Sequence, residues 1–349
     1  MKTIGILGGG QLARMIALAG APLGVRFLVV DNVADACAGQ VAPQITADWR
    51  DFAALQDFAK RIDVATFDFE NVPADTAHWL AERVAVFPNP RALATTQDRL
   101  VEKTLFRELG LATPAFAAVD SRDDLERALG TIGTPAVLKT RRLGYDGKGQ
   151  RRVDNLAAPV DESELAEELV AFDRELSIVG VRARNGDLGF WPVGENIHRD
   201  GILRLTRAPA AGAPQDEAEA ICAAVLEELD HVGVLAVELF DLGGRLLANE
   251  LAPRVHNTAH WTIDGAETSQ FENHLRAILG LPLGPTAARA PCVMVNLIGD
   301  VPPLGELLAL RGARVHLYGK EPRRGRKVGH VTLVDPEETT VDRLVALAG

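Results

Sequence analysis

The sequence predicts an α/β protein that begins with a parallel, doubly wound sheet and continues with antiparallel sheets covered by helices. Two observations carry this prediction. Short apolar strands alternate with helical segments through the first hundred residues, which is typical of a parallel sheet. From about Pro114, strands come in pairs around tight turns such as Asn185-Gly186 and Gly243-Gly244, which favours antiparallel pairing. A length of 349 residues allows two or three domains.

The first elements surround a glycine motif. Residues 3–7 predict a buried strand, and Gly8, Gly10 and Ala13 fit the pattern G-x-G-x-x-A at the start of a helix. Amide groups at such a helix start bind phosphate well. Asp31 closes the next strand, where a dinucleotide site places its ribose acid. The motif alone supports a dinucleotide oxidoreductase, a different phosphate ligand, or tight packing of helix on strand.

Apolar periodicity predicts the later elements. The expected strands cover residues 26–30, 64–69, 136–140, 175–184, 188–195, 234–240 and 245–250, and the expected helices cover residues 51–61, 161–169 and 218–230. The segment 161–169 is counted as a helix because it is acidic and looks exposed. The tail from Pro291 holds three short strands, a basic segment and a last helix.

The composition is that of a globular protein and excludes several functional classes. Hydrophobic residues make up 47% and charged residues 24%. With 37 basic and 48 acidic residues the formal charge is −11, which argues against general nucleic-acid binding. The three cysteines form no CxxC pair, so a disulfide framework and a cysteine zinc site are excluded, and a reducing cytoplasm fits. Because no stretch reaches the ~18 apolar residues of a membrane span, we expect no membrane partner.

A second glycine-rich segment follows the strand that ends near Lys139. Gly144, Gly147 and Gly149 would let the backbone close over phosphates, and Lys139 and Lys148 would supply positive charge. The segment lacks the Walker A pattern G-x-x-x-x-G-K-[ST]. The alternative is a flexible hairpin with exposed lysines.

Two carboxylates mark a candidate metal site. Glu238 and Glu250 stand about equally far from the Gly243-Gly244 turn, so antiparallel pairing brings them together. Each lies in an apolar run, and buried carboxylates in contact need a cation between them. Magnesium shared with nucleotide phosphates meets that need, and Asn249 offers a further oxygen.

Cationic groups follow the second carboxylate. Arg254, His256 and His260 together suggest capture of a small anion or of a developing charge, although each histidine alone is more often structural. The basic segment 320–327 is either a solvated charge run or a phosphate pocket for a second substrate. Glu70, at the expected carboxyl edge of the parallel sheet, either binds a ribose hydroxyl or caps a helix.

In this order, the segments resemble the ATP-grasp superfamily, which has a Rossmann-like domain, a small α+β lid domain that closes over ATP, and a C-terminal antiparallel α+β domain with magnesium carboxylates. Within it, the chain is similar to the family of 5-(carboxyamino)imidazole ribonucleotide synthases, the ATP-dependent carboxylases of bacterial and fungal purine synthesis. Four segments carry the resemblance: ILGGGQL (6–12), GYDGKGQ (144–150), NELAPRVHN (249–257) and GRKVGH (325–330). The corresponding domains cover residues 1–100, 101–185 and 186–349.

The resemblance implies a carbon–nitrogen ligase. ATP phosphorylates bicarbonate to carboxyphosphate, and the exocyclic amine of 5-aminoimidazole ribonucleotide captures that intermediate or carbon dioxide released from it. ADP and phosphate leave, and the lid excludes water because carboxyphosphate hydrolyses readily. The resemblance also implies Mg²⁺, with Mn²⁺ as a substitute, and a cytoplasmic homodimer.

The resemblance also assigns roles to individual residues. The catalytic residues it implies are Arg254, which stabilises charge on bicarbonate, Asp146, which orients the amine or accepts its proton, and His256 and Asn257 at the junction of the pockets. Glu238 and Glu250 bind the metal. The implied ATP ligands are Arg99 and Lys139 at the phosphates, the loop Gly144, Tyr145, Asp146, Gly147, Lys148, Gly149 and Gln150, the adenine-lining Glu167, Glu168 and Val170, the ribose-binding Glu175, and His198, Asn249 and Glu250. The implied pocket for the ribonucleotide is formed by Gly10, Gln11, Leu12, Glu70, Tyr145, Asp146, Lys320, Arg326 and Lys327.

One segment departs from the family pattern, and three alternatives stay open. Between Gln150 and Glu167 the lid is short and looks like an exposed helix where the family has an apolar strand. Another ATP-grasp ligase, such as a formate-dependent glycinamide ribonucleotide transformylase, would share the ATP and magnesium residues. An NAD-dependent oxidoreductase would leave Glu238, Glu250 and Arg254 without a role. A non-catalytic binding protein is at odds with the intact carboxylate pair.

Overall fold

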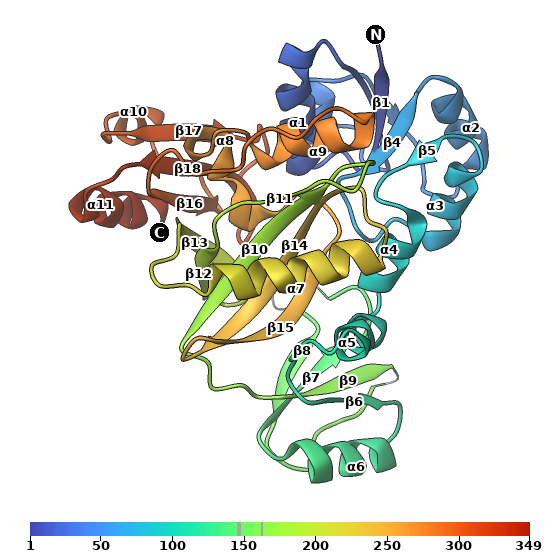
Figure 1. Cartoon of the computed structure of the whole chain (residues 1–349), viewed down its shortest axis with the longest axis vertical. Helices are drawn as coiled ribbons and strands as arrows, with labels where there is room; N and C mark the ends of the chain where they lie inside the picture. Colours follow the sequence, from blue (N-terminus) through green and yellow to red (C-terminus); the bar gives the residue numbers. More distant parts are fainter. Residues whose placement is uncertain (145–147, 162) are drawn as a thin grey trace.

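The computed structural model describes residues 1–144, 148–161 and 163–349, and their strands form three sheets (Figure 1). Tyr145, Asp146 and Gly147, which the sequence placed among the ligands, lie outside the described residues. The sheets follow one another along the chain, within residues 3–86, 116–168 and 174–334. The second sheet lies at one end of the molecule, and the first and third lie side by side (Figure 1).

The first sheet is parallel throughout, with the order β3-β2-β1-β4-β5, as the alternating pattern predicted. The elements of this region are β1 (Thr3–Leu7), α1 (Gln11–Gly20), η1 (Ala21–Leu23), β2 (Arg26–Asp31), η2 (Cys37–Gln40), β3 (Gln44–Thr46), α2 (Phe52–Lys60), β4 (Val64–Phe67), α3 (Ala74–Ala81), β5 (Ala85–Val86), α4 (Pro90–Thr96) and α5 (Arg99–Glu108). Strands β1, β2 and β4 are almost wholly buried and apolar, as strands covered on both faces must be. Their carboxyl ends meet at one edge, which places Gly8, Asp31 and Asp68 close together.

The second sheet is antiparallel, with the order β6-β9-β7-β8. Its elements are β6 (Phe116–Val119), α6 (Arg122–Ile132), β7 (Ala136–Thr140), β8 (Gln150–Val153) and β9 (Glu164–Glu168). The predicted helix over 161–169 is therefore wrong, because its middle is β9, paired on both sides. Buried Glu164 and Glu167 find cations on other strands: Arg151 Nη2 lies 2.8 Å from Glu164 Oε2, and Lys139 Nζ lies 2.8 Å from Glu167 Oε2. Because these partners are distant in sequence, the acidic composition falsely suggested exposure.

The third sheet is antiparallel, with the order β15-β14-β10-β12-β13-β16-β18-β17 and β11 paired to β10. Its strands are β10 (Arg174–Arg182), β11 (Leu188–Phe190), β12 (Gly194–Arg199), β13 (Ile202–Ala208), β14 (Gly233–Leu242), β15 (Arg245–Ala252), β16 (Cys292–Ile298), β17 (Ala313–Leu317) and β18 (Lys327–Val334). Its helices are α7 (Gln215–Glu228), η3 (Asn257–Ala259), α8 (Thr262–Gly265), α9 (Gln270–Leu279), α10 (Leu304–Leu308) and α11 (Glu338–Ala348). Both predicted hairpins are confirmed. The single return strand expected over 188–195 is instead two strands, separated at Pro192, which has no N–H to donate.

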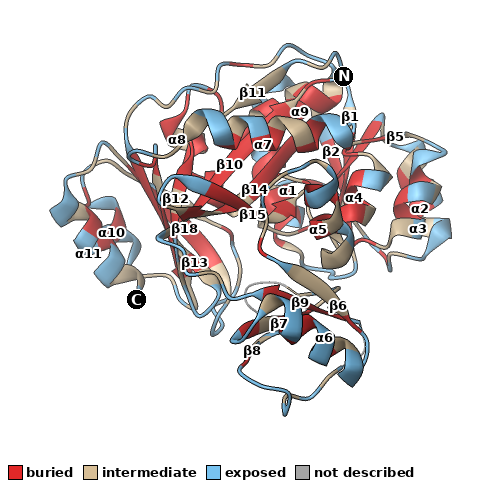
Figure 2. Ribbon diagram, turned by 60° about the horizontal axis from the view of Figure 1, so that its bottom comes forward, coloured by how far each residue is buried: buried red, intermediate tan, exposed pale blue. Residues whose placement is uncertain are grey.

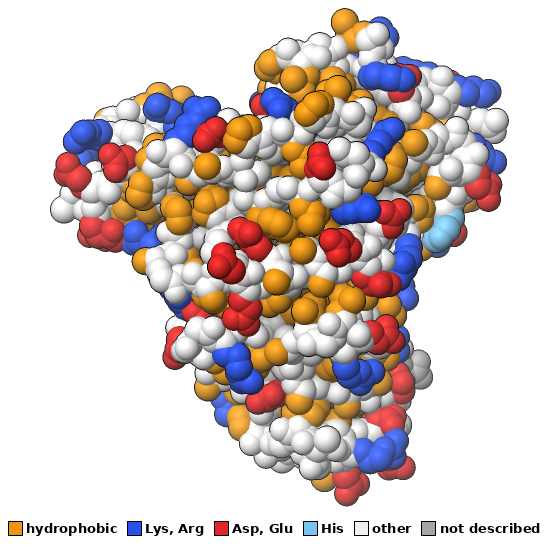
Figure 3. Space-filling view, viewed as in Figure 1, with side chains coloured by type: hydrophobic (Ala, Val, Ile, Leu, Met, Phe, Trp, Pro, Cys, Tyr) orange, Lys and Arg blue, Asp and Glu red, His pale blue; other side chains and the backbone are white. Residues whose placement is uncertain are grey.

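Helix α7 covers one face of the strands that carry the candidate site. Ala218, Ile221 and Val225 pack against strands β10 and β14, which are buried at the centre of the molecule (Figure 2). The opposite side of α7 carries acidic side chains, which gather in the middle of the face in Figure 3. This division between an apolar and an acidic side is what an amphipathic covering helix requires.

One hydrophobic core joins the first and third sheets. Ile6 and Met15 from the first region belong to the same buried cluster as Val179, Trp261 and Leu275. The second sheet has a core of its own, built around α6. No helix in the described parts of the chain is long and apolar enough to cross a bilayer.

Candidate active site

Glu238 on β14 and Glu250 on β15 lie directly opposite each other, as their spacing from the turn predicted. Glu238 pairs with Glu250 and Leu239 pairs with Ala248, so Asn249 is an extra residue that forms a β-bulge. The side chains of Glu238 and Glu250 keep 21% and 39% of their surface exposed. They are less buried than the surrounding apolar runs suggested, and a ligand can reach them.

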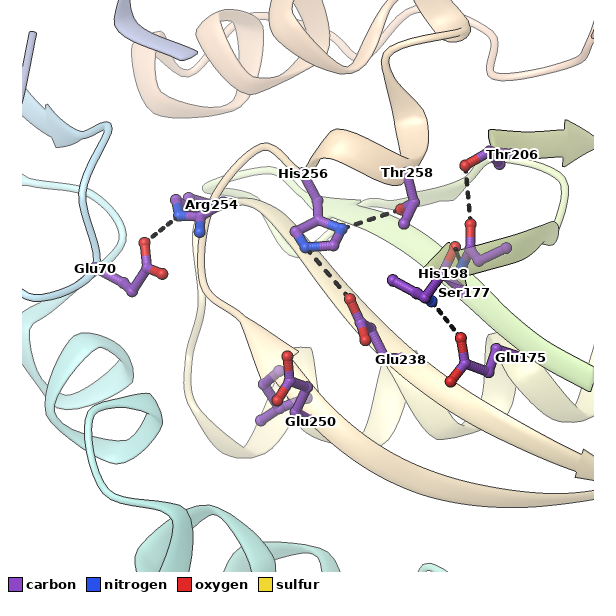
Figure 4. Close-up of polar contacts among 12 residues, drawn as sticks. Glu70, Glu175, Ser177, His198, Thr206, Glu238, Glu250, Arg254, His256 and Thr258 are labelled. Carbon is purple, nitrogen blue, oxygen red and sulfur yellow. Dashed lines mark hydrogen bonds and ion pairs between the residues drawn. The ribbon is translucent and has the colours of Figure 1, made fainter. Parts of the chain in front are cut away.

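The two carboxylates have different protonation equilibria. Burial acts to raise the pKa of Glu250, but Arg99, whose Nη1 lies 2.9 Å from Oε2, lowers it to about 2. Burial and the negative charge of Glu250 raise the pKa of Glu238 to about 7. His256 Nε2 lies 3.5 Å from Glu238 Oε1 (Figure 4), and burial together with Arg254 lowers the pKa of His256 to about 3. A neutral imidazole therefore faces Glu238 at pH 7, and a cation between the carboxylates would relieve their repulsion.

Three residues with oxygen donors for a divalent cation lie at the bulge or next to it. Asn249 Oδ1 is buried beside Glu250 and has no hydrogen-bond partner among the described residues. Two carboxylates and an amide oxygen are donors that Mg²⁺ accepts, with phosphate oxygens and water completing the shell. Within 1–144, 148–161 and 163–349, no group of three His, Cys, Asp or Glu side chains is placed to hold a metal by itself. The donor set therefore fits a cation shared with a bound phosphate.

Buried charges connect the second sheet to α5 and bring several predicted ATP ligands together. Lys139 Nζ lies 2.8 Å from Glu167 Oε2, and Lys103 Nζ on α5 lies 3.6 Å from the same oxygen. Burial acts to raise the pKa of Glu167, but the two lysines lower it below its usual range, so Glu167 is ionised. Arg99 also donates to Gly144 O at 3.4 Å. The loop returns through Lys148 and Gly149 to Gln150, which begins β8 opposite Lys139.

The remaining predicted ATP ligands lie near the start of β10. Glu175 forms a hydrogen bond with His198 Nδ1 on β12 (Figure 4). Burial acts to lower the pKa of His198, but the bond to Glu175 and the charge of Glu238 raise it. Glu168 Oε2 accepts a hydrogen bond from Ala115 N at 3.3 Å. Val170 is half-buried in the connection between β9 and β10.

Arg254 links the third sheet to the edge of the first. Its Nε lies 2.5 Å from Glu70 Oε2 (Figure 4). Burial acts to raise the pKa of Glu70, but Arg254 lowers it overall. His256 Nδ1 lies 3.1 Å from Thr258 Oγ1, and Asn257 begins η3 with both amide atoms buried and unpaired among the described residues. An arginine, a neutral imidazole and an unpaired amide thus gather beside the carboxylate pair.

The protein's own carboxylates occupy amides at the start of α1. Asp68 accepts hydrogen bonds from Gly10 N at 2.9 Å and Ala13 N at 2.8 Å, and Asp31 accepts one from Gly9 N at 2.6 Å. The carboxylate of Asp31 thus binds the backbone of the glycine motif itself. A Cβ at Gly10 would lie 2.5 Å from Asp68 Oδ2, so the motif needs glycine for this contact. Sequence reasoning missed Asp68, although its place after β4, beside β1, was a usable signal.

The basic segment reaches the glycine motif from the far end of the chain. Lys320 donates a hydrogen bond to Gln11 Oε1 at the start of α1, and Leu12 beside it is buried. Arg326 donates to Glu321 O within its own loop at 3.2 Å, and Lys327 begins β18. Lys320 and Gln11, which the sequence analysis placed in one pocket, are therefore in contact although they are 309 residues apart in the sequence.

Family models match three parts of the chain. The ribonucleotide synthetase preATP-grasp domain matches residues 1–97, the ATP-grasp domain residues 104–271, and the phosphoribosylaminoimidazole carboxylase C-terminal domain residues 292–344. The N5-carboxyaminoimidazole ribonucleotide synthase of Pseudomonas aeruginosa is 48% identical over 98% of this chain and 97% of its own length. The chain belongs to the N5-carboxyaminoimidazole ribonucleotide synthase family. The Bacillus subtilis synthase is 40% identical over 98% of this chain and 94% of its own length.

Solved structures of the synthase family share the fold. The synthetase from Thermus thermophilus is 50% identical, has a TM-score of 0.95, and matches 99% of this chain and 98% of its own. The Aspergillus clavatus synthase in complex with ADP and 5-aminoimidazole ribonucleotide is 29% identical with a TM-score of 0.92, over 99% of this chain and 98% of its own. The three sheets of this chain are thus the ATP-grasp fold of the synthase family, as the four sequence segments implied.

Proposed function

We propose that the chain carries out the reaction of its family, the ATP- and bicarbonate-dependent carboxylation of the exocyclic amine of 5-aminoimidazole ribonucleotide. The products are 5-carboxyaminoimidazole ribonucleotide, ADP and phosphate. Relatives with this name match nearly the whole chain, and solved relatives hold ATP, or ADP together with 5-aminoimidazole ribonucleotide. The observation on this chain that carries the proposal is the cross-strand pair of Glu238 and Glu250 beside Arg254 and His256.

The nucleotide half of the site uses the charges around β7, β9 and β15. Arg99 and Lys139 would turn from their carboxylate partners toward the phosphates of ATP, while Glu175 would bind ribose hydroxyls. Glu238, Glu250 and Asn249 would hold Mg²⁺ or Mn²⁺. When bound, that cation supplies charge neutralisation at the phosphates. The remaining ATP contacts we propose are the loop Gly144 to Gln150, the adenine-lining Glu167, Glu168 and Val170, and His198.

The bicarbonate half uses the segment after β15. A bicarbonate oxygen attacks the γ-phosphorus and ADP leaves, which converts an unreactive anion into one with a phosphate leaving group. Arg254 balances the negative charge of bicarbonate and carboxyphosphate, and His256 and Asn257 orient it. The amine nitrogen then bonds to the carboxyl carbon, phosphate leaves, and Asp146, outside the described residues, takes the proton.

The ribonucleotide pocket lies between the glycine motif and the basic segment. The amides of Gly9, Gly10 and Ala13 already donate to carboxylates of the protein. We therefore propose that the cationic side chains of residues 320–327 bind the phosphate of the substrate. The residues we place in this pocket are Gly10, Gln11, Leu12, Glu70, Tyr145, Asp146, Lys320, Arg326 and Lys327. Within the domain of residues 101–185, we also propose that the second sheet moves as a lid, which its separate core supports. We further propose that the protein is a cytoplasmic homodimer.

The decisive experiment measures ADP release from ATP and magnesium, with and without bicarbonate and 5-aminoimidazole ribonucleotide. We expect full rate only when both are present, and entry of labelled bicarbonate into an acid-labile product. If the rate of ADP release does not depend on the ribonucleotide but rises with formate and another amine, the chain is a different ATP-grasp ligase. No release under any combination would refute the proposed function.

A further inference from the structure

We propose that Glu102 is a positioning residue, which holds strand β15 against helix α5 and thereby fixes Glu250 for the metal–nucleotide complex. This inference rests on the proposed function. It concerns a residue that the sequence did not single out and that belongs to no predicted ligand set.

Glu102 makes one short hydrogen bond to the strand that carries Glu250. Its buried carboxyl oxygen Oε1 lies 2.6 Å from Leu251 N, the amide that directly follows Glu250. β15 is the last strand of its sheet, with β14 as its one neighbour among the described strands. The outward amide of Leu251 therefore has no partner strand, and Glu102 takes the place of one. A buried amide without an acceptor would be costly, so the contact fixes this end of β15. Two residues before Glu250, Ala248 N holds the same edge of the strand by donating to Ala112 O at 2.7 Å.

The same face of α5 holds the second sheet as well. Arg99, Glu102 and Lys103 stand at positions i, i+3 and i+4, so they project from one side of the helix. Arg99 contacts Glu250 at 2.9 Å, and Lys103 contacts Glu167 on β9 at 3.6 Å. Helix α5 lies at the junction of the second sheet and β15 (Figures 1 and 2). It therefore ties the strand of the predicted adenine ligands to the strand of the predicted metal ligands.

Two substitutions of Glu102 distinguish the effect of its hydrogen bond from the effect of its ionisable carboxyl group. Glu102→Gln removes the ionisable group and keeps an acceptor oxygen of the same reach toward Leu251 N. Glu102→Asp keeps a carboxyl group and is one methylene too short. A matched control is Glu217→Ala, because Glu217 Oε1 faces another amide of β15, Leu246 N, at 3.4 Å, near the far end of the hairpin. All three proteins are compared with the full-length wild type.

The measurement is the equilibrium binding of ADP by calorimetry across a range of magnesium concentrations. For Glu102→Asp we expect about tenfold more magnesium for half-maximal binding, as loss of one buried hydrogen bond implies. Glu102→Gln and Glu217→Ala should stay within about twofold of wild type, since each leaves an acceptor at Leu251 N. In turnover, the Glu102→Asp protein should show a raised KM for magnesium–ATP and an unchanged KM for 5-aminoimidazole ribonucleotide.

Several outcomes would overturn the inference. Wild-type magnesium dependence in Glu102→Asp would remove the positioning role, and an equal loss in Glu102→Gln would assign the effect to the acidity of the carboxyl group. If Glu102→Asp fails to fold, hydrogen exchange in the wild type decides, because a Leu251 amide that exchanges rapidly without nucleotide contradicts a preformed contact. A wild-type protein that binds no magnesium–ADP would instead refute the proposed function itself.

Discussion

Glu238 and Glu250 face each other across the β14–β15 hairpin, but in the described part of the chain Arg99 forms an ion pair with Glu250 and not with Glu238. The pair is therefore asymmetric. Arg99 keeps Glu250 ionised, whereas Glu238 faces a neutral His256 and has a pKa near 7. At pH 7 a cation that enters between them would therefore meet an ionised Glu250 and a Glu238 that is about half protonated.

Substitution of Glu250 by Gln should abolish ATP turnover and leave the fold intact. The amide keeps the shape but removes one of two charges that would hold the metal, so we expect a loss of roughly a hundredfold or more in the rate of ADP release. Thermal unfolding should shift by a few degrees at most. Glu227→Gln, an exposed carboxamide substitution on α7, is the control. Unchanged turnover in the Glu250→Gln protein would remove the proposed metal site.

Substitution of Asp68 by Ala should destabilise the protein and weaken binding of the ribonucleotide. The amides of Gly10 and Ala13 would lose their half-buried acceptor, which costs about 1–3 kcal/mol. Because Gln11 follows directly, the KM for 5-aminoimidazole ribonucleotide should rise while the KM for ATP stays the same. Urea unfolding and initial rates test the two effects separately. Equal changes in both KM values would contradict a local role.

Substitution of Lys320 by Met should act on one substrate alone. Lys320 contacts Gln11, and we place the ribonucleotide phosphate beside it. We expect the KM for the ribonucleotide to rise about tenfold, a typical loss for one charge-assisted contact, with ATP binding unchanged. Arg323→Met removes the same charge from an exposed position of the same segment and should have little effect. Equal effects of the two substitutions would indicate a diffuse electrostatic contribution.

His274 should make the free energy of unfolding depend on pH. It bridges two sheets, because Nε2 donates to Thr66 Oγ1 on β4 and Nδ1 accepts from Val234 N on β14. Burial, with a smaller contribution from His231, lowers the pKa of His274 to about 3. The unfolded chain takes up a proton near pH 6.5 and the folded protein does not, so stability is full above that pH and falls as the pH drops toward 3.

This linkage predicts a loss of about 2 kcal/mol from His274 between pH 7 and pH 5. Urea unfolding at the two pH values measures it. In His274→Gln the protein should be less stable at pH 7, and its stability should change less between the two conditions. An unchanged pH dependence in that variant would show that His274 has the same pKa in the folded and unfolded protein.

The sequence was most informative where partners are close along the chain. The hairpin around Gly243-Gly244 fixed the pairing of Glu238 with Glu250 because the turn defines the register. It misled at β9, since the cations that permit burial of Glu164 and Glu167 come from other strands. Asp68 and Glu102 were missed for the same reason, because each acts through a backbone amide far away in sequence. An isolated carboxylate gives no indication of which distant amide it will meet.

The shared core of the first and third sheets has a practical consequence for dissecting the protein. Ile6 and Met15 pack against residues from the last two-thirds of the chain, so a fragment ending near residue 100 would expose an apolar face and aggregate. The second sheet buries its apolar side chains within its own boundaries. Evolution or an engineer could therefore exchange it between relatives as a cassette, provided that the α5 contacts at its base are kept, whereas the two larger parts must be inherited together.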